Sequence, residues 1–144
     1  MKSILLFCVI LLICSSSLPA NEGITITITV TNIPGVKGDL LIGLYSSAES
    51  FTDKPMEQSL KIPLTSQADL VASIPNIPPG TYAIAVIQDL NRNGVLDKNL
   101  FGMPKEPLAF SGIKEIPKGK PEFSACSFEV KGTPVAIMIP LKIK

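Results

Sequence analysis

The stretch from residue 23 to residue 32 decides the fold class, and it reads Gly23-Ile24-Thr25-Ile26-Thr27-Ile28-Thr29-Val30-Thr31-Asn32. Isoleucine or valine occupies every second position, and threonine occupies the positions between them. Because successive side chains of a strand point to opposite faces, this alternation predicts a β-strand with one buried face. The residues are branched at Cβ on both faces, and such residues pack well on a pleated sheet.

Six further segments have the composition of short strands. Residues 40–45 are apolar on both faces, as expected of a central strand, and the others cover 58–64, 68–74, 81–88, 123–130 and 135–143. Thirteen prolines and ten glycines are spread along the chain, and no segment has a sustained helical period. Seven short strands with turn residues between them predict an all-β fold, a single seven-stranded Greek-key β-sandwich of the immunoglobulin-like or prealbumin-like kind.

One tyrosine supports the Greek-key prediction. Tyr82 follows a corner that contains Pro79 and Gly80, and it stands at the start of a buried strand. Greek-key sandwiches often place a tyrosine there, with its hydroxyl bonded to the backbone a few residues upstream. We therefore expect Tyr82 to have a structural role.

The first twenty residues have the layout of a secretory signal peptide. Lys2 gives a positive start, residues 4–14 are apolar, and small residues before Ala20 form a cleavage region. The apolar segment is too short to span a bilayer, which needs about 20 residues. We predict a signal peptide over 1–20, a sandwich domain over 21–144 without a transmembrane span, and a periplasmic or secreted location. Lipidation at Cys14 is the alternative, although Ile13 stands where a lipoprotein signal requires a small residue.

Charge and residue types exclude several classes of function. Removal of Lys2 with the signal peptide leaves 12 basic and 12 acidic residues, without a basic run, so we expect no nucleic-acid binding. The chain has no histidine, which excludes the usual Ser-His-Asp and Cys-His catalytic sites and imidazole-dependent metal sites. After cleavage Cys126 is the only cysteine, so it forms no internal disulfide and is expected to be a small buried hydrophobe.

The loop after the strand at 81–88 has the spacing of a metal site. It reads Asp89-Leu90-Asn91-Arg92-Asn93-Gly94-Val95-Leu96-Asp97. Side-chain oxygens fall at loop positions 1, 3, 5 and 9, and glycine falls at position 6, as in the first nine positions of an EF-hand calcium loop. The carbonyl of Val95 would be the ligand at position 7. The sequence therefore predicts a Ca²⁺ site with ligands from Asp89, Asn91, Asn93, Val95 and Asp97.

The match to an EF-hand ends at position 12, where Leu100 replaces the bidentate glutamate. Glu106 is the nearest downstream carboxylate, and we expect it to complete the site, with Asn99 as a second option. The alternative is a turn without metal, because Asn and Asp side chains hold such turns by bonding to the backbone. Arg92 and Lys98 stand nearby and would oppose a bound cation.

Three blocks follow one another between Pro79 and Ser111. They are Pro79-Gly80-Thr81-Tyr82-Ala83-Ile84-Ala85-Val86, the Asp89–Asp97 loop, and Phe101-Gly102-Met103-Pro104-Lys105-Glu106 with Phe110-Ser111. Together they resemble the domain-of-unknown-function 2141 family of secreted bacterial proteins. The resemblance implies a small exported β-rich protein, and it brings no activity with it. The position of Glu106 in the third block implies that it belongs to the same site as the loop.

These observations predict an exported, non-enzymatic β-sandwich protein with a weak structural calcium site. An enzymatic hypothesis is a hydrolase that uses Asp89 and Asp97 as paired carboxylates. Two further hypotheses need no metal: an accessory protein of the envelope, or a module that binds a protein or a small ligand there.

Overall fold

The computed structural model describes residues 23–66 and 68–142, and the predicted signal peptide lies outside them. These residues form eight strands and one short helix: β1 (Ile24–Thr31), β2 (Asp39–Tyr45), β3 (Leu60–Pro63), β4 (Leu70–Ile77), β5 (Gly80–Asp89), β6 (Leu108–Phe110), α1 (Phe123–Cys126), β7 (Ser127–Val130) and β8 (Val135–Pro140). No helix in this part of the chain is long and apolar enough to cross a membrane.

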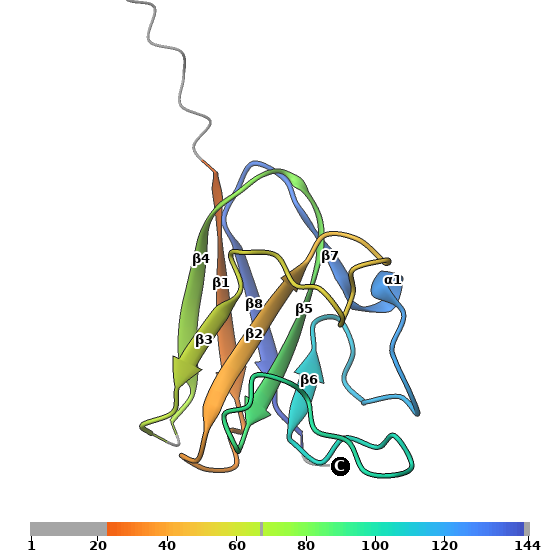
Figure 1. The fold of residues 1–144 in the computed structure, drawn as a ribbon. Helices are drawn as coiled ribbons and strands as arrows, with labels where there is room; N and C mark the ends of the chain where they lie inside the picture. The colour runs from red at the N-terminus through yellow and green to blue at the C-terminus, as the bar shows by residue number, and fades with distance from the viewer. Residues whose placement is uncertain (1–22, 67, 143–144) are drawn as a thin grey trace, which may run out of the picture.

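The strands form two sheets (Figure 1). In the three-stranded sheet, β1 lies between β4, to which it is antiparallel, and β8, to which it is parallel. In the five-stranded sheet, β2 lies between β3 and β5. The other edge of β5 is shared by β7 near its start and β6 near its end. The all-β, two-sheet prediction is therefore confirmed.

The main core lies between the two sheets. Buried and half-buried residues alternate along β1, so that Ile26, Ile28 and Val30 have no exposed surface and the threonines between them are half-buried. Alternate residues of β2 and β5 enter the same core, among them Ile42 and Ile84. The alternation of apolar residues along β1 is thus the pattern that holds the sheets together.

A second, smaller core covers the outer face of the five-stranded sheet. Its centre is Phe51, whose ring meets those of Tyr45, Phe110 and Phe123 edge-on. Phe51 is 1% exposed, although it lies in the polar segment between β2 and β3. The segment between β2 and β3 is therefore held against β2, β6 and α1 by aromatic contacts.

The structure corrects four strand predictions. It has eight strands where seven were predicted, because the three residues of β6 are too few to give a period in the sequence. The strand predicted over 58–64 is shorter, and residues 123–126 form the helical turn α1 before β7 begins. The fourth correction concerns β4, which runs through Pro75 and Asn76, predicted to be a corner. A bulge opposite β1 accommodates these two residues.

The predicted tyrosine corner is present as a hydrogen bond. The Tyr82 hydroxyl donates to the carbonyl oxygen of Pro78, 3.0 Å away and four residues upstream. The side chain of Tyr82 is 5% exposed and packs in the main core. Its structural role is confirmed.

Cys126 is fully buried in the second core, as predicted. Burial raises the pKa of its thiol from 9.0 to about 11. Its contribution to stability is therefore complete below pH 9 and is lost as the pH rises through 11, because the unfolded chain releases the proton first. We expect guanidinium unfolding to show a steeper loss of stability in this alkaline range for the native chain than for Cys126→Ala. Equal slopes would contradict the expectation.

Candidate functional site

The loop that begins at Asp89 emerges from the end of β5. Asp89 is the last residue of that strand and has no exposed surface. It stands opposite Asp39 in the register of β2 and β5. Two acidic residues therefore meet at one end of the five-stranded sheet, directly beneath the loop.

Side-chain oxygens at alternate positions hold the loop by accepting backbone N–H groups. The two carboxylate oxygens of Asp89 accept from Asn93 at 3.1 Å and from Gly94 at 2.7 Å. Asn91 Oδ1 also accepts from the Asn93 N–H at 3.1 Å, and Asn93 Oδ1 accepts from the Val95 N–H at 3.0 Å. Gly94 has a φ of +82°, which is the left-handed conformation predicted for the turn.

Asp97 closes the loop from its other end. Its two carboxylate oxygens accept from the side-chain amides of Asn91 at 2.7 Å and Asn93 at 3.1 Å. Through these bonds and those of Asp89, all four side chains that were predicted as metal ligands belong to one hydrogen-bonded cluster. The structure brings together Asp89, Asn91, Asn93 and Asp97 as the sequence pattern predicted.

Glu106 joins the two ends of the loop through the backbone. One of its carboxylate oxygens accepts from the Leu90 N–H at 2.8 Å, and the other accepts from the Asp97 N–H at 3.1 Å. Glu106 is 5% exposed, so these bonds are shielded from water. Asn99, the second option for completing the site, lies apart because its Oδ1 accepts from Phe101 and Met103 within its own turn.

The three carboxylates of this cluster have no cationic partner in residues 23–66 and 68–142. Asp39 forms ion pairs with Lys61 and Arg92, each at 3.2 Å, so Arg92 is directed toward Asp39. Within the described residues, Asp89, Asp97 and Glu106 form no ion pair and are balanced only by N–H groups. The loop therefore carries uncompensated negative charge.

The oxygen atoms of this cluster suit a hard cation. Carboxylate and amide oxygens are the ligands that Ca²⁺ takes, and an oxygen that accepts one N–H keeps a second lone pair. No group of three or more acidic, histidine or cysteine side chains in residues 23–66 and 68–142 has an arrangement that could hold a metal ion. A cation would therefore depend on the asparagine oxygens and the Val95 carbonyl as much as on Asp89 and Asp97.

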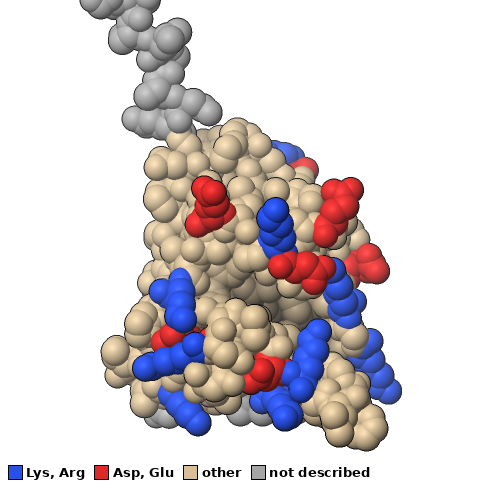
Figure 2. All heavy atoms as spheres, in the orientation of Figure 1, with Lys and Arg blue, Asp and Glu red and all other residues tan. Residues whose placement is uncertain are grey.

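A pocket that the sequence pattern did not predict lies beside the loop. It has a volume of about 630 Å³ and lies between the outer face of the five-stranded sheet and the segments 52–61 and 94–121. The space-filling view shows this face hollowed at its centre, with acidic and basic side chains around the hollow (Figure 2). The signal in the sequence is the small size of Gly43 and Ala85, which stand opposite each other in β2 and β5 and line the pocket, with the side chain of Tyr45 lying over Gly43.

A model of one protein family matches residues 28–138, and that family is described as "Uncharacterized protein conserved in bacteria (DUF2141)". No match to the chain was found among curated proteins or among solved structures.

Proposed function

The chain belongs to the DUF2141 family of uncharacterized bacterial proteins, and we propose that it is an exported, non-enzymatic module with one weak Ca²⁺ site in the Asp89–Asp97 loop. The observation that carries this proposal is the cluster of Asp89, Asp97 and Glu106, three carboxylates that form no ion pair with any described residue. The side chain of Asp89 is a fully buried carboxylate, and its only described partners are two N–H groups. A buried charge is costly unless it is paired or coordinates a metal.

The proposed ligands are side-chain oxygens of Asp89, Asn91, Asn93 and Asp97, together with the carbonyl of Val95. Their hydrogen bonds to backbone N–H groups fix the side chains before an ion binds. Glu106 is the predicted sixth ligand, and its bonds to both ends of the loop give it a supporting role in any case. Few carboxylates and a partly exposed loop favour a Kd of about 10⁻⁴–10⁻³ M, the range of extracellular modules.

Export and the finer fold class belong to the same proposal. The signal peptide layout of residues 1–20 supports a periplasmic or secreted location. The bond from Tyr82 to Pro78 and the β3-β2-β5 order support a Greek-key sandwich of the immunoglobulin-like or prealbumin-like kind. The absence of histidine supports a role without acid–base catalysis.

Calcium is expected to raise the melting temperature of the protein relative to EDTA, because an ion that binds only the folded state stabilises it. At calcium about tenfold above Kd the stabilisation is about 1.4 kcal/mol, which corresponds to several degrees for a domain of this size. The measurement is a thermal melt followed by circular dichroism, in millimolar calcium and in EDTA.

Two variants make the melt specific to the loop. Asp97→Asn keeps one acceptor for the asparagine amides but removes a carboxylate, so its melting temperature should no longer respond to calcium. Asp69→Asn removes an exposed carboxylate outside the loop and should respond as the native chain does. An equal response in all three proteins would assign the effect to general charge screening, and no response in any would leave the loop as a metal-free turn.

The metal-free alternative is a module that binds a small ligand, and the pocket favours it. Small-molecule sites are concave, mostly apolar and about 300–1,000 Å³ in volume, and the pocket falls within that range. This second candidate does not depend on calcium.

A further inference from the structure

We infer that the pocket binds a small molecule with an apolar chain and one carboxylate, and that Lys98 is the partner of that carboxylate. The inference rests on the ligand-binding candidate above and names the chemistry of its ligand. It is carried by the apolar floor of the pocket, by a lysine at its edge that has no partner among the described residues, and by the hydroxyl of a tyrosine that lines it.

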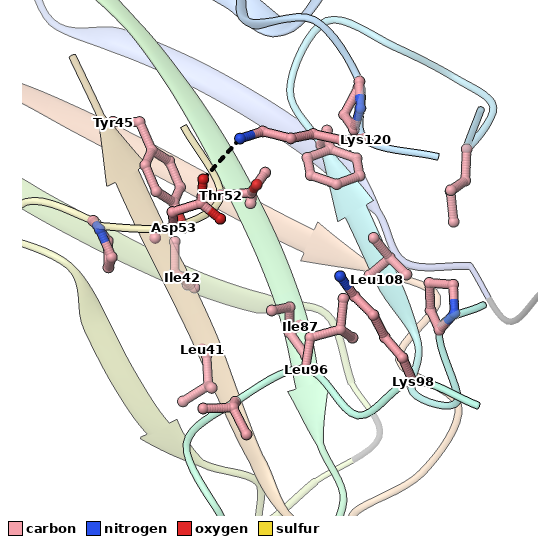
Figure 3. A pocket seen from close by; sticks show the side chains of 18 of the residues that line it. Leu41, Ile42, Tyr45, Thr52, Asp53, Ile87, Leu96, Lys98, Leu108 and Lys120 are labelled. Atoms are coloured by element: carbon pink, nitrogen blue, oxygen red, sulfur yellow. Dashed lines mark hydrogen bonds and ion pairs between the residues drawn. The ribbon is translucent and has the colours of Figure 1, made fainter. Parts of the chain in front are cut away.

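The floor of the pocket is the outer face of the five-stranded sheet. Leu41 of β2, Ile87 of β5 and Leu108 of β6 contribute apolar side chains to it (Figure 3). Leu41 and Ile87 stand opposite each other in the β2–β5 register, and Ile87 stands opposite Leu108 in the β5–β6 register. The three side chains therefore form a continuous apolar row across the sheet, which suits an apolar chain laid along it.

The wall opposite the sheet adds further apolar surface. Leu96 belongs to the Asp89–Asp97 loop, Met103 follows that loop, and Ile116 comes from the segment before α1. Met103 is 38% exposed, and Leu96 and Ile116 are half-buried, so their apolar surfaces are only partly covered by the protein itself. A bound apolar chain would remove this surface from water, at roughly 25 cal/mol per Å² of apolar area.

The three lysines that line the pocket differ in whether their ammonium group has an acidic partner. Lys61 pairs with Asp39 at 3.2 Å, and Lys120 pairs with Asp53 at 2.9 Å. The ammonium group of Lys98 has no ion pair or hydrogen bond with any residue in 23–66 or 68–142, and the side chain points into the pocket in Figure 3. Among the described residues that line the pocket, the one charge without a partner is therefore positive, which selects against cations and favours a single anionic group.

The hydroxyl of Tyr45 is a second polar group on the pocket. Tyr45 lines the pocket and is 5% exposed, and its hydroxyl has no hydrogen-bond partner among the described residues. Burial, together with the nearby Asp53 carboxylate, raises the pKa of this hydroxyl, so it remains a donor at neutral pH. A carboxylate accepts both from a hydroxyl and from an ammonium group, whereas an alkane can use neither.

Other ligand classes fit less well. Sugars are usually bound against aromatic platforms, and the chain has no tryptophan and only two tyrosines, both largely buried. A nucleotide or another polyanion would need several free cations, and the pocket offers Lys98 alone as a cation without a described partner. A monocarboxylate with an apolar chain would contact the apolar floor with its chain, and Lys98 and the Tyr45 hydroxyl with its carboxylate.

The test is a calorimetric titration of the purified protein with octanoate and with octanol, which share a chain and differ in the carboxylate. We expect octanoate to bind at least about tenfold more tightly, because a hydrogen bond to a charged group is the stronger kind. Lys98→Met should reduce octanoate binding to the level of octanol. Lys118→Met, which removes an exposed lysine outside the pocket lining, should change neither affinity.

A blocking variant locates the site. Ile87→Trp places an indole in the floor of the pocket and should abolish binding of both compounds, provided that a thermal melt shows it to be folded. Equal affinity for octanoate and octanol, unaffected by Lys98→Met, would overturn the inference about the carboxylate and leave the ligand-binding candidate standing. Absence of binding by either compound would overturn both.

Discussion

Asp89→Ala is expected to lower the free energy of unfolding by about 3–5 kcal/mol, measured by guanidinium denaturation in EDTA. Asp89 has no exposed surface, and its two oxygens accept from the backbone of Asn93 and Gly94. Removal of the carboxylate leaves the Gly94 N–H without its acceptor and leaves the Asn93 N–H with Asn91 Oδ1 alone. Because EDTA is present, the loss includes no contribution from bound calcium.

The matched variants separate this effect from a change in net charge. Asp89→Asn retains one acceptor oxygen of the same shape and should lose about half as much stability as the alanine variant. Asp69→Ala removes an exposed carboxylate and should change stability by no more than about 0.5 kcal/mol. If Asp89→Ala were as stable as Asp69→Ala, Asp89 would not be the residue that holds the loop.

Gly38→Ala is also expected to lower the free energy of unfolding by about 3–5 kcal/mol. Gly38 lies just before β2, with a φ of +83°, a conformation that residues with a Cβ rarely adopt. A Cβ at this position would lie 2.0 Å from the carbonyl oxygen of Asp89. The atoms that this Cβ would meet belong to the backbone of Asp89 and Leu90. Because backbone atoms cannot rotate away as a side chain can, the base of the loop itself would have to move.

Gly132→Ala is the control for the backbone conformation. Gly132 has a φ of +69°, but no atom lies within 4 Å of the Cβ that alanine would add. The free energy of unfolding of Gly132→Ala should therefore fall only by the conformational cost, about 1–3 kcal/mol. Equal losses at the two glycines would mean that the close approach of residue 38 to Asp89 does not matter for stability. The melts of both variants in calcium would also show whether movement of the loop base weakens its response to the ion.

The two-sheet fold could be predicted where the strands are long and one-sided. The period of two in β1 follows from burial of Ile26 and Ile28 on one face, and the same is true of alternate residues in β2 and β5. The prediction from sequence was wrong where tertiary contacts decide the local structure. In α1, Phe123 turns into the aromatic cluster around Phe51, a contact between residues far apart in the sequence.

The candidate loop could be predicted more fully than its surroundings. The positions of Asp89, Asn91, Asn93 and Asp97 follow from a local spacing, and the bonds between them join residues at most 6 positions apart along the chain. The role of Glu106 required knowledge of which segment returns to the loop. Its contacts with the Leu90 and Asp97 N–H groups depend on where β6 docks on β5.

The pocket could not be predicted, because it is made by distant segments. Its floor comes from β2, β5 and β6, and its walls come from the start of β3 and from segments with no regular structure. Small residues such as Gly43 and Ala85 are ordinary in the sequence and acquire meaning only when the register places them side by side. In the sequence, Lys98 is visible only as a charge that opposes a bound cation.

The most direct test of the calcium proposal is a titration of the ¹⁵N-labelled protein with CaCl₂, followed by the amide resonances of Asn93, Gly94 and Val95. These N–H groups donate to the side-chain oxygens of Asp89, Asn91 and Asn93, so an ion bound by those oxygens changes their environment. We expect their shifts to move and saturate at about 10⁻⁴–10⁻³ M calcium while resonances of β1 and β8 stay in place. Shifts that remain unchanged through millimolar calcium would contradict the proposal and establish the loop as a turn held by hydrogen bonds alone.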